Sequence, residues 1–260
     1  MAVKKEVSAA LWSGIQPLLP DVSKSPRGGR PRLSNELALN GILFVLRTGT
    51  PWEYLPQELG FGSGMTCWRR LREWQAAGVW HQLHLLLLAE LRGAGRLDFS
   101  RVSLDGASVS NSGGIVHGAQ PTDRGKLGSK RHLVTDRQGI PLRFCVTGAN
   151  RHDSVVLEEL VDAIPRVAGK RGRPRSRPDK LHADKGYDFR QRGIQSRIAR
   201  RGVERNDRLG RHRWVVERTH AWLAAFGKLR IRFERNCQTH VALLSLACCV
   251  ICARTLPAFC

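Results

Sequence analysis

Three acidic residues, far apart in the chain, stand in contexts that suit chemistry. Asp105 follows the segment Arg101–Leu104 and precedes a glycine. Asp184 follows Lys180–Ala183, and Glu217 lies in the stretch Arg-His-Arg-Trp-Val-Val-Glu-Arg-Thr-His. Carboxylate oxygens are hard ligands that suit magnesium or manganese, and carboxylates that meet repel one another unless cations neutralise them. If the fold brings these acids together, they form a metal site.

Taken alone, Asp105 has a simpler interpretation. Val102, Leu104 and Val109 predict a buried strand that presents the acid. An Asp-Gly pair beside a strand is more often a turn than a catalytic site. The two later acids favour catalysis, so the elements that position all three acids decide between the two interpretations.

The charge of the chain is strongly and unevenly positive. The 260 residues include 43 Lys and Arg against 22 Asp and Glu, a formal net charge of +21. Most of the surplus lies in residues 166–235, around Asp184 and Glu217, whereas residues 97–165 are balanced. Such a surplus predicts a polyanionic partner, most commonly nucleic acid, although ribosomal and membrane-surface proteins are similarly basic.

Residues 1–96 predict a small all-α domain with helices over Leu11–Pro20, Ser34–Gly49, Thr66–Ala77 and Val79–Arg92. One arginine-rich helix among short helices resembles a helix-turn-helix unit, and a plain bundle with a solvated basic face explains the pattern equally well. A Pro-, Gly- and Arg-rich stretch before the second helix is either a minor-groove arm or a solvated linker. Candidate DNA contacts in this domain are Arg30, Arg32, Arg69, Arg70 and Arg72.

Residues 97–260 predict an α/β domain. Its expected elements are a strand around Asp105, a Gly-rich mobile loop, a hairpin with Asp136 in its turn, a helix capped by Asp153, and a short strand before Asp184. A flexible basic segment over Pro165–Pro178 precedes that strand. A helix over 211–226 and an apolar closing helix over Val241–Ala253 follow.

The helix over 211–226 carries Glu217. Val215, Trp222 and Phe226 form its expected apolar stripe, and Glu217 lies outside that stripe together with Arg213. The helix therefore directs a carboxylate toward a cleft or toward solvent.

The cysteines and the apolar runs indicate the cellular compartment in which the protein acts. Seven cysteines include the pair Cys249-x-x-Cys252 inside an apolar run, which favours buried thiols in a reducing cytosol over a redox or zinc pair. No run approaches the roughly 20 apolar residues of a membrane span, and no signal peptide is evident. We expect a cytoplasmic protein with no membrane partner.

In their order, the motifs resemble those of the DDE transposases of bacterial insertion sequences, and among them the insertion-sequence-five family, from about Leu11 to Arg254. They are Arg47-Thr-Gly-Thr-Pro-Trp-Glu-Tyr-Leu-Pro, Trp68-Arg-Arg-Leu-Arg-Glu-Trp, Asp105-Gly, Gly128-Ser-Lys-Arg-His-Leu-Val, Asn150-Arg-His-Asp-Ser, Asp184-Lys-Gly-Tyr-Asp and Leu209-Gly-Arg-His-Arg-Trp-Val-Val-Glu-Arg-Thr.

The resemblance implies a ribonuclease-H-like mixed sheet flanked by helices. It implies that Asp105, Asp184 and Glu217 are the catalytic residues and hold Mg²⁺ or Mn²⁺, with two ions expected. The implied activity is metal-dependent phosphodiester cleavage and strand transfer, with terminal inverted repeats and target DNA as partners of a homodimer or higher assembly. His132 and His220 are expected to be structural or DNA-facing. Candidate phosphate contacts are Lys126, Lys130, Arg213, Arg218 and Lys228.

Two departures from the family pattern define an alternative. A tyrosine and a basic residue of the broader signature are replaced by Gly210 and Ala224, and the segment from Asp184 to Arg197 is shorter by about one helix. The alternative is a catalytically dead transposase relic that only binds DNA. Another nuclease on the same scaffold is the rival among enzymes.

Overall fold

The computed structural model of the chain describes residues 7–21, 31–112, 118–119, 125–151, 153–183, 195–196 and 210–256. Asp105 and Glu217 lie within these ranges, whereas Asp184 lies outside them.

The amino-terminal half of the fold is helical, and its main boundaries follow local signals. Ser34 caps the second helix by accepting a hydrogen bond from the N–H of Leu37, and Gly49 ends that helix with a φ of 80°. The third helix begins two residues before the predicted Thr66, because Ser63 caps it. The helices are α1 (Ala9–Ile15), α2 (Asn35–Thr48), α3 (Gly64–Ala76) and α4 (Val79–Gly93).

A mixed sheet follows, as the sequence predicts. Antiparallel β4, β3 and β1 lie side by side, and β5 and β6 continue from β1 in parallel. Asp105 on β1 is opposite Leu133 on β3, and Ser103 on β1 is opposite His182 on β5. The strands are β1 (Val102–Ser110), β2 (Gly118–Ala119), β3 (Leu127–Thr135), β4 (Pro141–Gly148), β5 (Lys180–His182) and β6 (Gln195–Ser196). This strand order, with helices packed on the sheet, is ribonuclease-H-like.

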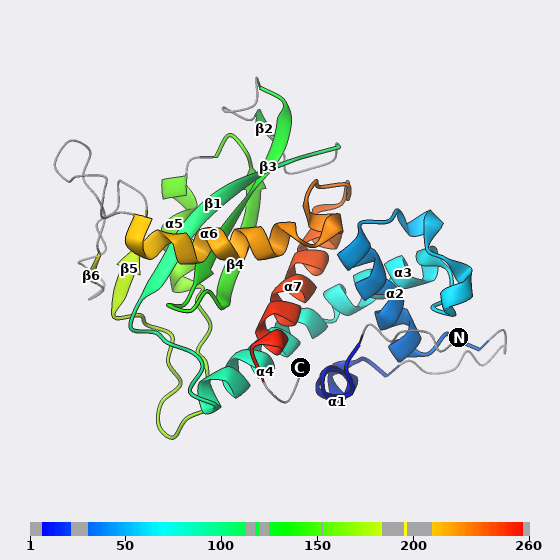
Figure 1. Ribbon diagram of the computed structural model, residues 1–260, viewed down its shortest axis with the longest axis horizontal. Helices are drawn as coiled ribbons and strands as arrows, with labels where there is room; N and C mark the ends of the chain where they lie inside the picture. Colours follow the sequence, from blue (N-terminus) through cyan, green and yellow to red (C-terminus); the bar gives the residue numbers. More distant parts are fainter. Residues whose placement is uncertain are drawn as a thin grey trace.

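Three later helices complete the fold: α5 (Asp153–Asp162), α6 (Gly210–Ala224) and α7 (Cys237–Arg254). Helix α5 packs on β3 and β4, and α6 lies across the sheet against β1 and β3 (Figure 1). Helix α7 lies between the sheet and the amino-terminal helices, where it contacts α3, α4 and β4 (Figure 1).

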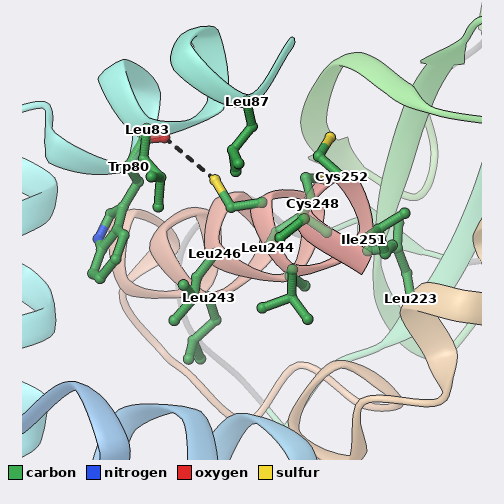
Figure 2. Close-up of a cluster of buried hydrophobic side chains, with 14 of the residues drawn as sticks. Trp80, Leu83, Leu87, Leu223, Leu243, Leu244, Leu246, Cys248, Ile251 and Cys252 are labelled. Carbon is green, nitrogen blue, oxygen red and sulfur yellow. Dashed lines mark hydrogen bonds between the residues drawn. The ribbon is translucent and has the colours of Figure 1, made fainter. Parts of the chain in front are cut away.

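Helix α7 joins the two halves into one hydrophobic core. Leu243, Leu244 and Leu246 of α7 are fully buried, and the cluster around them includes Leu83 of α4 and Leu223 of α6 (Figure 2). Helix α7 is long and apolar enough to cross a membrane by length and composition, but 72% of it is buried inside the protein. Its apolar character is therefore explained by its place in the core.

The described cysteines are free thiols, as expected. Cys67, Cys248, Cys249 and Cys252 are buried, and no disulfide links any of the six cysteines that the structure describes. The Cys249 thiol donates a hydrogen bond to the backbone oxygen of Trp80, 3.6 Å away (Figure 2). Burial raises the pKa of the Cys248 thiol to about 12, so this group is an inert part of the packing.

The basic segment over Pro165–Pro178 makes backbone contacts that the sequence did not predict. Val167 and Arg175 exchange backbone hydrogen bonds of 2.9 and 3.0 Å. Arg92 of α4 donates hydrogen bonds to the backbone oxygens of Val167 and Arg173. The sequence pattern could not reveal these contacts, because the anchoring side chain lies about 75 residues earlier.

Two glycines let the end of α2 meet the turn that follows α6. A Cβ on Gly227 would lie 2.5 Å from the backbone oxygen of Thr48 and 2.8 Å from the backbone nitrogen of Gly49. Only hydrogen fits between two backbones this close. The contact therefore fixes the end of α6 relative to the helical half of the protein.

Replacing Gly227 tests this contact. We expect Gly227→Ala to lower the free energy of unfolding by at least about 2 kcal/mol, because rigid backbone rather than a flexible side chain must move. Urea unfolding measures the change. The control Ala224→Ser alters an exposed position nearby and should change stability by no more than about 0.5 kcal/mol. Equal stability of Gly227→Ala and wild type would show that the two backbones do not meet as described.

Candidate active site

Asp105 occupies the point on β1 where burial gives way to exposure. Val102, Ser103 and Leu104 are buried, and Asp105 is half-buried. Because β1 and β5 are parallel and Ser103 is opposite His182, the carboxyl ends of both strands lie at the same end of the sheet. Asp184 follows β5 by two residues in the sequence and is outside the described residues.

Glu217 is exposed in the middle of α6, as expected from its position outside the apolar stripe. Val215 and Phe226 of the predicted stripe are buried, as expected. Val216 and Leu223 are fully buried, whereas Trp222 is 37% exposed and takes no part in the buried face. The helix therefore turns its aliphatic side to the sheet and leaves Glu217 accessible.

His220 connects the helix of Glu217 to the strand of Asp105. Its Nε2 donates a hydrogen bond to the backbone oxygen of Asp105, at 3.4 Å. Glu217 precedes His220 by three residues, so the two are neighbours on the helix surface. Helix α6, which carries Glu217, thus contacts β1 at Asp105.

The β3–β4 turn supports α6 on its other side. Thr219 donates a hydrogen bond of 2.8 Å from Oγ1 to the backbone oxygen of Gly139. Arg218 donates one from Nη2 to the backbone oxygen of Gln138. Within this turn, the Asp136 carboxylate accepts hydrogen bonds from the N–H groups of Asp98, Gln138 and Ile140. Asp136 is a turn residue, as predicted, and burial raises the pKa of its carboxyl to about 6.

The histidines bond to protein atoms, which agrees with a structural role. His132 is buried and its Nε2 lies 2.8 Å from Oγ1 of Thr147. Burial, and next the charge of Arg131, lower the pKa of His220 to about 4. His220 is therefore neutral at pH 7, and its Nε2 carries the proton donated to Asp105.

Two of the predicted DNA contacts are buried against the protein. Arg70 is 4% exposed and donates hydrogen bonds to Asn35 Oδ1 and the Leu33 backbone oxygen. Lys228 is 5% exposed, and its Nζ lies 3.5 Å from the backbone oxygen of Thr50. Burial lowers the pKa of Lys228. Both side chains act in packing, which corrects their expected place on the surface.

The other predicted DNA contacts differ in solvent exposure. Arg69, Arg72 and Lys126 are exposed and Lys130 is half-buried. Arg72 stacks over the ring of Trp68 at 4.7 Å, and Arg32 forms an ion pair with Glu73. Arg30 and the side chain of Arg213 lie outside the described part of the structure.

Sequence reasoning missed a carboxylate that links the two halves of the chain. Glu234 accepts hydrogen bonds from the indole nitrogens of Trp52, at 2.8 Å, and Trp68, at 3.4 Å. Lys228 lies over the rings of Trp52 and Phe233. No local pattern reveals these partners, because more than 160 residues separate Glu234 from either tryptophan.

Within the described ranges, no three His, Cys, Asp or Glu side chains lie close enough to hold a metal ion. Asp105 and Glu217 are two members of the predicted set, and the third is outside those ranges. Their chemistry suits the expected ion, because both supply carboxylate oxygens, which magnesium and manganese prefer.

Comparisons with known proteins decide the family. The model for "Transposase DDE domain" matches residues 97–252, and the model for "Putative transposase of IS4/5 family" matches residues 7–84. The chain belongs to the IS4/5 family of DDE transposases. The "Putative transposase for insertion sequence element IS402" of Burkholderia cepacia is 52% identical over 146 residues, 54% of this chain and 69% of that protein.

Further relatives cover smaller parts of this transposase. The "Insertion element IS402 uncharacterized 16.2 kDa protein" of Burkholderia cepacia is 55% identical over 41% of this chain and 74% of its own length. The "Transposase for insertion sequence element IS1106" of Neisseria meningitidis serogroup B is 26% identical over 47% of this chain and 42% of its own length. No solved structure matches.

The hydrogen bond between His220 and Asp105 predicts an acid-sensitive junction. A histidine whose pKa is lowered on folding stabilises the fold above its unfolded pKa of about 6.5, and that contribution is lost as pH falls toward the folded value of about 4. We expect the decrease in free energy of unfolding between pH 7 and pH 5 to be about 2 kcal/mol smaller in His220→Gln than in wild type.

Urea unfolding at both pH values measures this difference. Asp136 has the opposite effect on the pH dependence of stability, because its raised pKa stabilises the fold as pH falls. Wild type and His220→Gln both contain Asp136, so its effect cancels in the comparison. Exposed His81 provides the control, and His81→Gln should reduce the pH dependence much less because solvent reaches its ring. An unchanged pH dependence in His220→Gln would contradict the buried, neutral state of this histidine.

Proposed function

We propose that this transposase cleaves DNA at the ends of its own insertion sequence and transfers the cut strand into target DNA. The observation that carries the proposal is the docking of α6 on β1, which brings the helix of Glu217 to Asp105 through His220. The family supports the same proposal, since residues 97–252 match the transposase DDE domain.

Asp105, Asp184 and Glu217 would hold Mg²⁺ or Mn²⁺ through carboxylate oxygens. Such ions would supply Lewis-acid activation of the attacking water or 3′-hydroxyl and charge stabilisation at the leaving 3′-oxygen. The elements of this chain would position the acids: β1 carries Asp105, and α6, which packs on β1, carries Glu217. His220 is neutral and bonded to the Asp105 backbone, so its proposed role is to orient the helix.

We further propose that residues 1–96 bind DNA and residues 97–260 carry out the chemistry. Exposed Arg69 and Arg72 on α3 support a DNA-facing role for that helix. Lys126, Lys130 and Arg213 are proposed phosphate contacts nearer the acids. The net charge of +21 favours a phosphate backbone, and a dimer or larger assembly would hold two transposon ends together.

Acid variants test catalysis. We expect Asp105→Asn, Asp184→Asn and Glu217→Gln each to lower magnesium-dependent cleavage by at least about a hundredfold, because each removes a charged metal ligand worth several kcal/mol. The substrate is a duplex that carries the sequence flanking the open reading frame. Denaturing gels measure cleavage, and gel shifts measure binding, which should persist.

The control for these variants is Glu158→Gln, which removes an exposed carboxylate from α5 and should cut at the wild-type rate. Cleavage by Glu217→Gln at the wild-type rate would reject this residue as a catalytic acid. Tight binding without cleavage by wild type itself would instead support a DNA-binding protein without catalytic activity.

Arginine variants of α3 test the DNA-binding role. We expect Arg69→Ala and Arg72→Ala each to weaken duplex binding. The slope of the logarithm of the binding constant against the logarithm of salt concentration should become shallower by about one for each phosphate contact that is lost. Binding titrations at several salt concentrations measure the slope. Arg70→Ala is the contrast, because removal of this buried side chain should lower thermal stability instead. Unchanged slopes in both exposed variants would place the DNA elsewhere.

A further inference from the structure

The segment between α5 and β5 carries a group of exposed positive charges that the candidate active site does not use. Residues 166–177 contain five arginines, one lysine and no acidic residue. The guanidinium of Arg175 is paired with the carboxylate of Asp179 at 2.5 Å. Within the described ranges, the other five cations are exposed and make no ion pair: Arg166, Lys170, Arg171, Arg173 and Arg177. We name residues 166–177 the basic loop.

The basic loop is bonded to itself and to α4. Hydrogen bonds between the backbones of Val167 and Arg175 close its base. Arg92 of α4 donates hydrogen bonds to backbone oxygens on both arms of the loop. A Cβ on Gly169 would lie 2.0 Å from the backbone oxygen of Ala89, so the loop backbone touches the helix (Figure 1). These contacts restrict the conformations of the loop, so a ligand that binds it loses less affinity to ordering.

The basic loop joins the sheet at the end away from the acids. The N–H of Asp179, just after the loop, donates a hydrogen bond of 3.0 Å to the backbone oxygen of Phe99, just before β1. Because β1 and β5 are parallel, the loop meets the sheet at the amino ends of both strands. Asp105 lies three residues beyond Val102 on β1, a distance of about 10 Å. At about 3.4 Å per base pair, DNA on the loop would be at least about three base pairs from Asp105.

The basic loop is also separate from the arginines of α3. Helix α3 ends beside the start of α4 at Val79, whereas the loop contacts α4 at Ala89 and Arg92. At about 1.5 Å per residue, the ten residues from Val79 to Ala89 span about 15 Å. Helix α3 extends from the start of α4 away from the loop (Figure 1). The loop is therefore a different surface from the one already proposed to bind DNA.

We propose that the basic loop is a further phosphate-binding surface, which holds duplex DNA away from the reaction centre. Five unpaired cations within twelve residues repel one another, and the closely spaced phosphates of a duplex neutralise such a group. Four of the five are arginines, whose planar guanidinium groups bind phosphate oxygens in a bidentate geometry. The inference rests on the proposed function for the identity of the polyanion as DNA.

The composition of the basic loop favours DNA over an anionic membrane. Basic segments that lie on a membrane generally insert large apolar side chains such as Trp, Phe or Leu beside their cations. Residues 168–174, which form the exposed part of the loop, have only alanine, glycine and proline among their cations. Cations without an apolar anchor suit a duplex, because the phosphates of a duplex lie on its outside.

Removal of charge from the basic loop tests the proposal. The probes are two duplexes of about 30 base pairs, one with the sequence that flanks the open reading frame and one of unrelated sequence. EDTA is present so that cleavage plays no part. We expect the triple variant Lys170→Ala/Arg171→Ala/Arg173→Ala to bind both duplexes at least about tenfold more weakly at about 0.1 M salt, because phosphate contacts do not depend on base sequence.

The salt dependence of binding provides a second measure of the same contacts. In the triple variant, the slope of the logarithm of the binding constant against the logarithm of salt concentration should become shallower by about two to three. Fluorescence-anisotropy titrations at several salt concentrations measure both the affinity and the slope.

Two control variants keep the test specific. Arg171→Lys/Arg173→Lys keeps both charges and should keep the wild-type slope. Arg137→Ala removes an exposed arginine that is already paired with Asp98, at 3.5 Å, and should change the slope little. Thermal unfolding followed by circular dichroism should match wild type for the loop variants, since the altered side chains are exposed.

Three outcomes would overturn the proposal. Wild-type affinity and slope in the triple variant, with weaker binding by Arg69→Ala and Arg72→Ala, would reject the loop as a DNA contact and leave the proposed function intact. Failure of wild type to bind either duplex would reject both. Loss of binding to vesicles with about 30% phosphatidylserine in the triple variant, with duplex binding unchanged, would assign the loop to a membrane surface.

Discussion

The packing of α6 on β1 is the constraint on which the proposed catalytic role depends. Val216 and Leu223 bury the aliphatic side of the helix, and His220 bonds to the backbone of Asp105. The opposite side of the same helix is left to Glu217, Trp214 and Trp222, which are exposed. Hydrophobic burial thus determines which side chains of α6 can meet a substrate, because the buried face fixes the rotation of the helix.

Polar contacts then determine how the sheet and α6 are positioned relative to the helical half of the transposase. Glu234 accepts two indole hydrogen bonds from that half, and Gly227 touches the backbone at Gly49. Lys228 lies between these contacts with its charge over aromatic rings. A segment directly after α6 is therefore bonded to the region proposed to bind DNA.

Local signals in the sequence predict most of the elements, and partners far along the chain explain the failures. Ser34 and Gly49 mark both ends of α2 because capping involves only neighbouring residues. The expected place of Trp222 in the apolar stripe is wrong, since its true partner is the cation of Arg218. The charges of Arg70 and Lys228 predict surface positions, but acceptors more than 30 residues away hold both side chains inside.

The place of α7 in the core has a consequence for biosynthesis. The ribosome produces the four amino-terminal helices first and α7 after all the strands, yet α7 fills the space between them. Until residue 254 has emerged, α4 and β4 lack the surface that covers them. A nascent chain therefore exposes apolar surface that α7 covers only after nearly all of the chain has been made, and such surface favours aggregation.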